Sequence, residues 1–151
     1  MHRAIIISII VLLSASCTKR LEKKLISPKV KIEFRMASDK PVDGFEEKEL
    51  NGKKIFLNPK VEITEKDIAC VYQVNDQNYL PTISLEMNKI GTQKFAELTA
   101  NNISKMLAII VNGKIVMAPV IQSKILGGKV QITTGPVKPE IDSLFKSMTD
   151  Y

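Results

Sequence analysis

Large aromatic side chains are scarce in this sequence, which has 151 residues, no tryptophan and only 5% aromatic residues. The hydrophobic core must therefore be built mostly from isoleucine, valine, leucine and methionine. With 44% hydrophobic and 25% charged residues, the chain is long enough for one compact domain with a short appendage. We expect a single domain with aliphatic packing.

Histidine and cysteine are nearly absent: His2 is the only histidine, and the two cysteines are Cys17 and Cys70. If the N-terminal segment is removed, no histidine remains, which excludes an imidazole base and a histidine-containing metal site. If Cys17 is also consumed by acylation, only Cys70 remains as a free thiol, and no internal disulfide can form. Cys70 lies in a strand pattern and is interpreted as a buried hydrophobic residue. The sequence predicts no enzyme, no cofactor and no metal.

The N-terminus has the order of a secretory signal. His2 and Arg3 precede an apolar run at residues 4–13 that is too short to span a bilayer comfortably, and residues 14–16 then lead to Cys17. This order resembles the signal of a bacterial lipoprotein, in which the cysteine is lipidated and becomes the mature N-terminus. The match is loose at Ser14, where a large aliphatic residue is usual. The alternatives are a plain secreted protein and an uncleaved anchor.

The resemblance divides the chain into three parts: a signal peptide at residues 1–16, a lipidated tether at residues 17–28, and a domain at residues 29–151. It implies a location in the bacterial cell envelope, attached to a membrane through the lipid on Cys17, with the domain facing the periplasm or the exterior. The net charge of +6 would suit a nucleic-acid-binding protein in the cytosol. Export argues against that partner.

Alternating apolar and polar residues predict strands at residues 30–36, 54–57, 68–74 and 83–87. Residues 39–51 are rich in turn-forming residues and are interpreted as a loop or a loose hairpin. Thr64 and Asp67 form a capping-box pattern that opens a single helical turn. Consecutive amphipathic strands with short polar turns favour antiparallel pairing.

The most clearly patterned segment is residues 87–121, which predicts a helix followed by a hairpin. Asn88 is the expected N-cap of a helix at residues 89–101 that turns Ile90, Phe95, Leu98 and Thr99 towards one side. Gly91 in its first turn predicts close packing against a strand. The helix is expected to end through a left-handed residue at Asn101 or Asn102.

The hairpin is predicted from an apolar strand at residues 106–111, covered on both faces, and from the Asn112-Gly113 turn signal. Pro119 places the end of the returning strand at an edge or a bulge. A last strand follows the turn at residues 127–128, and a final helix presents an apolar stripe to the sheet at Ile141, Leu144, Phe145 and Met148. The predicted fold is α+β, a mainly antiparallel sheet with two helices packed on one face.

The segment from residue 83 to residue 148 resembles the head subdomain of the first periplasmic domain of SecD, in the SecDF protein-export family. The matching features are Gly91 with Phe95 and Leu98-Thr99, Leu107-Ala108-Ile109 with Asn112-Gly113, Ala118-Pro119 with Ile121, and Gly127-Gly128 ahead of Ile132 and Gly135. These glycine, proline and apolar positions indicate a fold and carry no reactive group. Ser104 departs from the family, which usually has glycine there. No segment after Cys17 is long or apolar enough to cross a membrane, so energy-driven pulling by SecD does not carry over.

The resemblance implies a noncatalytic envelope lipoprotein that contacts an exported polypeptide, the Sec translocon or another envelope-assembly partner. The residues that bind are not identified by the sequence. Adaptable methionine contacts are one source of such a surface, although the pattern favours core positions for Met36, Met87, Met106, Met117 and Met148.

Two alternatives stay open at this point. A structural lipoprotein would self-associate, with the strand edge near Pro119 as the contact. A carboxylate-based hydrolase would need an acid/base pair, for which Glu46 with Glu47, or Glu62 with Glu65, are the available residues.

Overall fold

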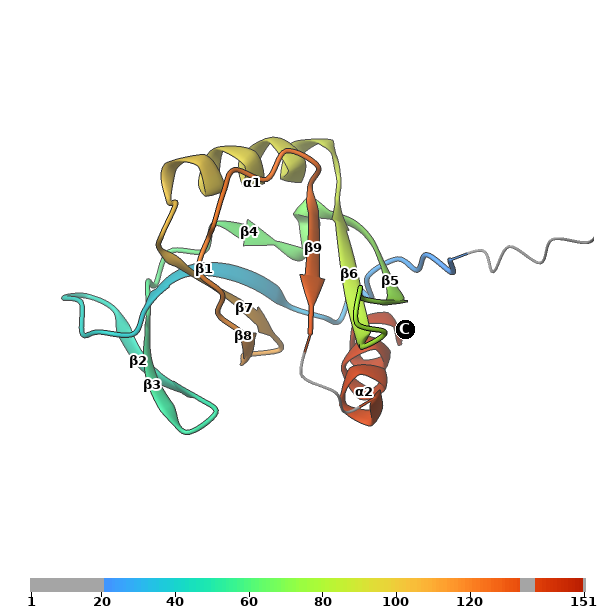
Figure 1. Cartoon of the computed structure of the whole chain (residues 1–151), viewed down its shortest axis with the longest axis horizontal. Helices are drawn as coiled ribbons and strands as arrows, with labels where there is room; N and C mark the ends of the chain where they lie inside the picture. Colours follow the sequence, from blue (N-terminus) through green and yellow to red (C-terminus); the bar gives the residue numbers. More distant parts are fainter. Residues whose placement is uncertain (1–20, 134–137, 151) are drawn as a thin grey trace, which may run out of the picture.

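The computed structural model describes residues 21–133 and 138–150. These residues form two antiparallel sheets and two α-helices (Figure 1). One sheet has the strand order β2-β3-β1-β7-β8, with β4 paired to β1, and the other has the order β5-β6-β9. The elements are β1 (Ile32–Ser38), β2 (Glu46–Leu50), β3 (Lys53–Leu57), β4 (Ile63–Thr64), the 3₁₀ helix η1 (Glu65–Asp67), β5 (Ile68–Asn75), β6 (Pro81–Met87), α1 (Lys89–Asn101), β7 (Met106–Val111), β8 (Lys114–Met117), β9 (Lys129–Ile132) and α2 (Lys138–Thr149).

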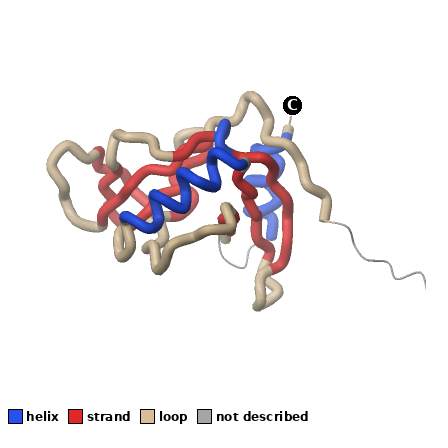
Figure 2. The backbone as a smooth tube through the Cα atoms, turned by 90° about the horizontal axis from the view of Figure 1, so that it is seen from above, coloured by secondary structure: helices blue, strands red, loops and turns tan. Residues whose placement is uncertain are grey.

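The predicted α+β class, antiparallel pairing and two helices are confirmed. The strands divide between two sheets because η1 interrupts the chain between β4, which pairs with β1, and β5, which pairs with β6. Figure 2 shows the two helices apart from each other, with α2 beside the three-stranded sheet. Helix α1 contacts η1, β4 and β6, whereas α2 contacts β5 and β6. The strand at residues 46–50 was expected only as part of a loop or loose hairpin, and it pairs fully with β3.

Strand β7 is buried on both faces, as predicted from its apolar run. Leu107, Ile109 and Val111 belong to the main core. Ala108 and Ile110 belong to a second cluster, which the β2–β3 hairpin completes with side chains such as Ile55 and Leu57. The six-stranded sheet therefore lies between two apolar layers.

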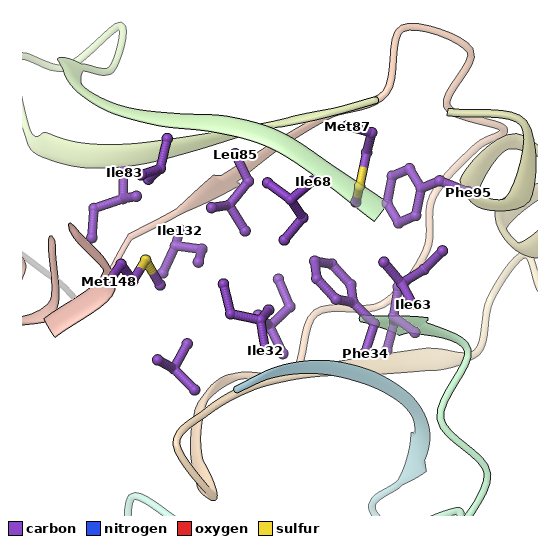
Figure 3. Close-up of a cluster of buried hydrophobic side chains, with 14 of the residues drawn as sticks. Ile32, Phe34, Ile63, Ile68, Ile83, Leu85, Met87, Phe95, Ile132 and Met148 are labelled. Carbon is purple, nitrogen blue, oxygen red and sulfur yellow. The ribbon is translucent and has the colours of Figure 1, made fainter. Parts of the chain in front are cut away.

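The main core fills the space between the two sheets (Figure 3). Ile32, Phe34 and Ile63 project from the six-stranded sheet, and the facing side chains are Ile68, Ile83, Leu85, Met87, Ile132, Phe95 and Met148. The rings of Phe34 and Phe95 meet edge to face with their centroids 6.0 Å apart. Met36, Met87 and Met148 are buried, which confirms core positions for these three methionines.

Helix α1 begins at the predicted N-cap, where the Asn88 side chain accepts a hydrogen bond from the Gly91 amide at 2.9 Å. Its buried face consists of Gly91, Phe95 and Thr99, one helical turn apart. The prediction that Ile90 faces the core is wrong, since 63% of Ile90 is exposed. Gly91 faces η1, and Ile90, one position earlier in the helix, therefore points away from the core.

Gly91 lies so close to η1 that a side chain has no room. A Cβ atom built on Gly91 would overlap the Asp67 carbonyl oxygen and lie 2.9 Å from the Asp67 Cβ. The neighbour is thus the 3₁₀ turn rather than the predicted strand. The Asn88 amide group donates to the Asp67 carbonyl at 2.9 Å and its side chain donates to the Lys66 carbonyl at 2.7 Å, so the start of α1 is fastened to η1.

Two further expectations differ from the structure. The left-handed residue after α1 is Ser104, with φ of 67°, whereas Asn102 has φ of −133° and Asn101 is the last helical residue. In β5, a bulge between Ile68 and Cys70 shifts the alternation, so that Val71 enters the core. Cys70 is therefore half-buried instead of buried.

The segment at residues 21–30, which we call the strap, lies against the domain. The Lys24 amide and carbonyl groups both pair with Val71 at 2.8 Å, the Ser27 amide donates to the Met148 carbonyl at 2.8 Å, and Val30 is buried in the core. The part of the expected tether that the structure describes is thus in contact with β5 and α2.

Replacing Gly91 with alanine is expected to destabilise the domain by about 1–3 kcal/mol, because the new methyl group overlaps the backbone of Asp67. Gly127→Ala is the matched control, since a Cβ at Gly127 meets no atom within 4 Å, and its effect should stay within about 0.5 kcal/mol. Urea unfolding measures both. Equal stabilities for the two variants would contradict the tight contact between α1 and η1.

Candidate functional site

A cleft of ≈ 580 Å³ opens at the end of the six-stranded sheet where β1 ends and β7 begins. Its walls are the last residues of β1, the β1–β2 loop at residues 39–45, the β3–β4 connection at residues 58–62, and the α1–β7 connection at residues 102–105. In Figure 1 the β1–β2 loop, which lines this cleft, is at the left end of the molecule. Segments far apart in the sequence meet here because β1 and β7 pair along their whole length.

Local hydrogen bonds shape the loops around the cleft. The Ser38 hydroxyl accepts from the Lys40 amide at 3.0 Å, and the Asn58 side chain accepts from the Lys60 amide at 2.9 Å. Both are turns closed by a side chain, as serine and asparagine commonly form. The backbone of the α1–β7 connection is also held in place, because the Ser104 amide donates to the Ile121 carbonyl at 2.8 Å. The cleft is therefore preformed by ordered backbone.

The cleft combines apolar side chains with charges of both signs. Met36, Val42, Phe45 and Met106 supply the apolar part, and 41% of Val42 is exposed. The charged lining residues are Asp39, Lys60, Glu62 and Lys105.

Apolar surface continues beyond the cleft lining. Ile103 lies in the same α1–β7 connection and is 50% exposed, and Val120 bridges to Met106 and is 44% exposed. This mixture of apolar and charged side chains suits contact with another macromolecule or peptide.

The carboxylate pairs considered for a hydrolase are held by separate partners. Glu46 lies 3.8 Å from Arg35, Glu47 pairs with Lys54 at 2.7 Å, and Glu62 pairs with Lys60 at 2.9 Å. The Glu65 carboxylate accepts from the Ile32 amide at 3.3 Å. The structure thus gives each of these four acids a partner of its own, and it does not bring either pair together as an acid and a base.

Two buried carboxylates, Glu33 and Asp67, were not identified from the sequence as buried. Burial alone raises the pKa of Glu33, but hydrogen bonds from Lys31 and Arg35 outweigh it and lower the pKa. Burial likewise raises the pKa of Asp67, and hydrogen bonds from Lys94 and Thr64 lower it by more. A general acid at neutral pH needs a raised pKa, so both groups act as structural anions.

Of the two cysteines, Cys70 lies among the described residues and Cys17 lies outside them. At Cys70, burial and the nearby Glu86 carboxylate raise the pKa of the thiol, which keeps it protonated and poorly nucleophilic at neutral pH. Within residues 21–133 and 138–150, no three His, Cys, Asp or Glu side chains gather in a way that could hold a metal ion.

The strand edge expected near Pro119 pairs with β7. The Pro119 carbonyl accepts from the Leu107 amide at 2.9 Å, and the next residue, Val120, bridges to Met106. The chain after β8 therefore continues along β7 in the same antiparallel direction.

Comparison with known proteins decides the family. The model for the SecDF P1 head subdomain matches residues 35–145. The chain belongs to this family. The resemblance to SecD is thereby confirmed. The cleft of this protein therefore lies on a SecD-type head.

Relatives of the SecDF head cover most of the chain. Protein translocase subunit SecD of Magnetococcus marinus is 28% identical over 135 residues, or 84% of this chain and 26% of that protein. A crystal structure of SecDF in its super-membrane-facing form has a TM-score of 0.63 and 28% identity, covering 80% of this chain and 19% of that one.

A second SecDF structure, described as a membrane component that enhances protein export, has a TM-score of 0.60 and 27% identity, covering 80% of this chain and 63% of that one. The chain spans about a quarter or less of the length of the curated relatives that it matches. Neither helix among the described residues is long and apolar enough to cross a membrane.

The lowered pKa of Asp67 predicts a pH-dependent contribution to the stability of this SecD-type head. Because the folded pKa lies below the ordinary value of 3.8, the stabilisation is present above that value and is lost as the pH falls through the folded pKa. Asp67→Asn should therefore cost about 1–3 kcal/mol at pH 7 and less at pH 3, below the ordinary value of 3.8, measured by urea unfolding. Asp43→Asn, in an exposed loop, is the control with no change. A deficit of the same size at both pH values would contradict the assignment.

Proposed function

We propose that this protein is a noncatalytic binding module of bacterial protein export that contacts an exported polypeptide through the cleft between β1, the β1–β2 loop and the α1–β7 connection. The observation that supports this proposal is the apolar and charged lining of the cleft. Membership of the SecDF P1 head family supports the link with protein export. A related SecDF is described as enhancing protein export, which supports the same process for this protein.

The composition of the cleft fits a variable, unfolded ligand. Its volume lies within the roughly 300–1,000 Å³ of ordinary ligand pockets, enough for a short peptide segment. The flexible, half-buried side chain of Met106 can adapt to different apolar groups. Lys60 and Lys105 on one hand, and Asp39 and Glu62 on the other, accommodate residues of either charge. Low selectivity is what a module that handles many exported chains requires.

The same proposal includes a lipid on Cys17 and a location in the cell envelope with the domain facing the periplasm or the exterior. The order of charges, apolar residues and small residues before Cys17 supports it. The partner is the exported chain or a component of the Sec translocon. The lipid would keep the head at the membrane where such chains emerge.

Site-specific photo-crosslinking in living cells tests the cleft. A photoreactive amino acid at Val42 or Ile103 is expected to capture exported polypeptides or a Sec component, because both side chains are exposed beside the cleft. Tyr79 is the control: it is 86% exposed but lies in the β5–β6 turn, on the other sheet. We expect several-fold more crosslinked product from the cleft positions, identified by mass spectrometry. Equal yields from Tyr79, or products without secretory or Sec proteins, would contradict the proposal.

A further inference from the structure

Only a few residues separate Cys17 from the strap at residues 21–30. Cys17 precedes Leu21 by four residues. Four residues extend at most about 14 Å, whereas a domain of this size is roughly 35 Å across. A lipid on Cys17 therefore cannot leave the domain free to turn in every direction, provided that the strap stays in place.

Backbone pairing holds the strap on β5 and α2. Lys24 exchanges two hydrogen bonds of 2.8 Å with Val71, in the manner of an antiparallel strand pair, and so covers the outer edge of β5. Ser27 is fully buried, and its amide donates to the Met148 carbonyl of α2 at 2.8 Å. These contacts continue the three-stranded sheet by a short additional pairing.

Side chains add to this attachment. The Lys23 ammonium group pairs with Glu86 at 2.7 Å and lies 5.5 Å from the centre of the Tyr72 ring. The Lys24 ammonium group lies 5.6 Å from the centre of the Phe145 ring in α2. Ammonium groups are attracted to aromatic faces at this distance. The strap is therefore attached by its backbone and by both of its consecutive lysines.

The strap and the cleft lie at opposite ends of the domain. In Figure 1 the strap is the blue segment at the right, beside β5 and α2, and the β1–β2 loop that borders the cleft is at the far left. Two leucines of the strap, Leu21 and Leu25, are 52% and 66% exposed. Apolar side chains beside a lipid anchor are suited to the membrane interface.

We propose that the strap orients the domain on the membrane: it seats the end formed by β5 and α2 on the lipid surface, with Leu21 and Leu25 at the interface, and holds the cleft away from the bilayer. This inference rests on the proposed lipid at Cys17. It assigns the strap a function that a free tether does not have, because a polypeptide would then meet the cleft at a fixed height above the membrane.

Energy transfer to the bilayer measures this orientation in the lipidated, full-length protein. The protein is reconstituted into phosphatidylcholine vesicles that carry an acceptor dye on a lipid headgroup. A donor dye is attached to one introduced cysteine, Lys146→Cys in α2 or Lys60→Cys beside the cleft, with Cys70→Ala to remove the other thiol. Both lysine side chains are highly exposed, at 76% and 70%. We expect at least twofold more transfer from position 146 than from position 60. Equal transfer overturns the proposal.

A proline in the strap separates orientation from anchoring. Lys24→Pro removes the amide that donates to Val71, and it should bring the two transfer efficiencies together while the protein stays on the vesicles. Glu22→Pro is the matched control, since the described part of the chain shows no backbone hydrogen bond at Glu22, and the twofold difference should persist. A difference unchanged by Lys24→Pro overturns the proposal. Circular dichroism verifies that each variant is folded, and the comparison of positions 146 and 60 in the unmodified strap needs neither proline.

Vesicle flotation of Cys17→Ala reports on the anchor itself. Loss of flotation is expected if the lipid is attached there. Flotation that persists overturns both the anchor and the orientation that rests on it, whereas flotation lost together with equal transfer in the lipidated protein overturns the orientation alone.

Discussion

Strand β7 is buried on both faces, and the rest of the molecule is arranged around that constraint. Its six residues are all apolar, so neither face of the strand is suited to contact with water. A layer of apolar side chains must therefore cover each face. The sheet β5-β6-β9 and the helices supply one cover, and the β2–β3 hairpin supplies the other. The pairing of β7 with β1 also brings Met106 beside Met36 and Ala37. The requirement to bury β7 therefore positions the cleft.

Local signals explain the parts of the fold that the sequence predicts well. Helix α1 has the predicted limits because Asn88 caps its start, and the hairpin turn at Asn112-Gly113 has positive φ at both residues, 49° and 81°. These features depend on neighbours within a few residues. The family resemblance depends on the same positions, which is why it could be recognised before the fold was known.

Features that depend on distant contacts were missed. Glu33 has the alternation of a solvent-facing strand residue, yet it is buried and forms ion pairs with Lys31 and Arg35. Ile90 is apolar but exposed, because Gly91 alone can approach Asp67. The bulge at Cys70 and the strap pairing with Val71 have no signature in their own residues. The cleft could not be predicted because its walls come from four separate segments, although exposed Val42 and Ile103 between patterned elements are a weak indication.

A SecD-type head provides a scaffold, and its function lies in the surface that this scaffold presents. Here the buried Glu33 and Asp67 carboxylates pair with basic side chains, and the cleft offers apolar and charged contacts. Adaptable contacts fit a ligand whose sequence varies, as exported polypeptides do.

The methionines allow the central claim to be measured directly. In protein with ¹³C-labelled methionine methyl groups, an unfolded secretory polypeptide is titrated while the resonances of Met106 in the cleft, and of Met87 and Met148 in the core, are followed by NMR. The account predicts saturable shifts of Met106 with Met87 and Met148 nearly unchanged. The absence of saturable binding, or shifts confined to the core methionines, would contradict it.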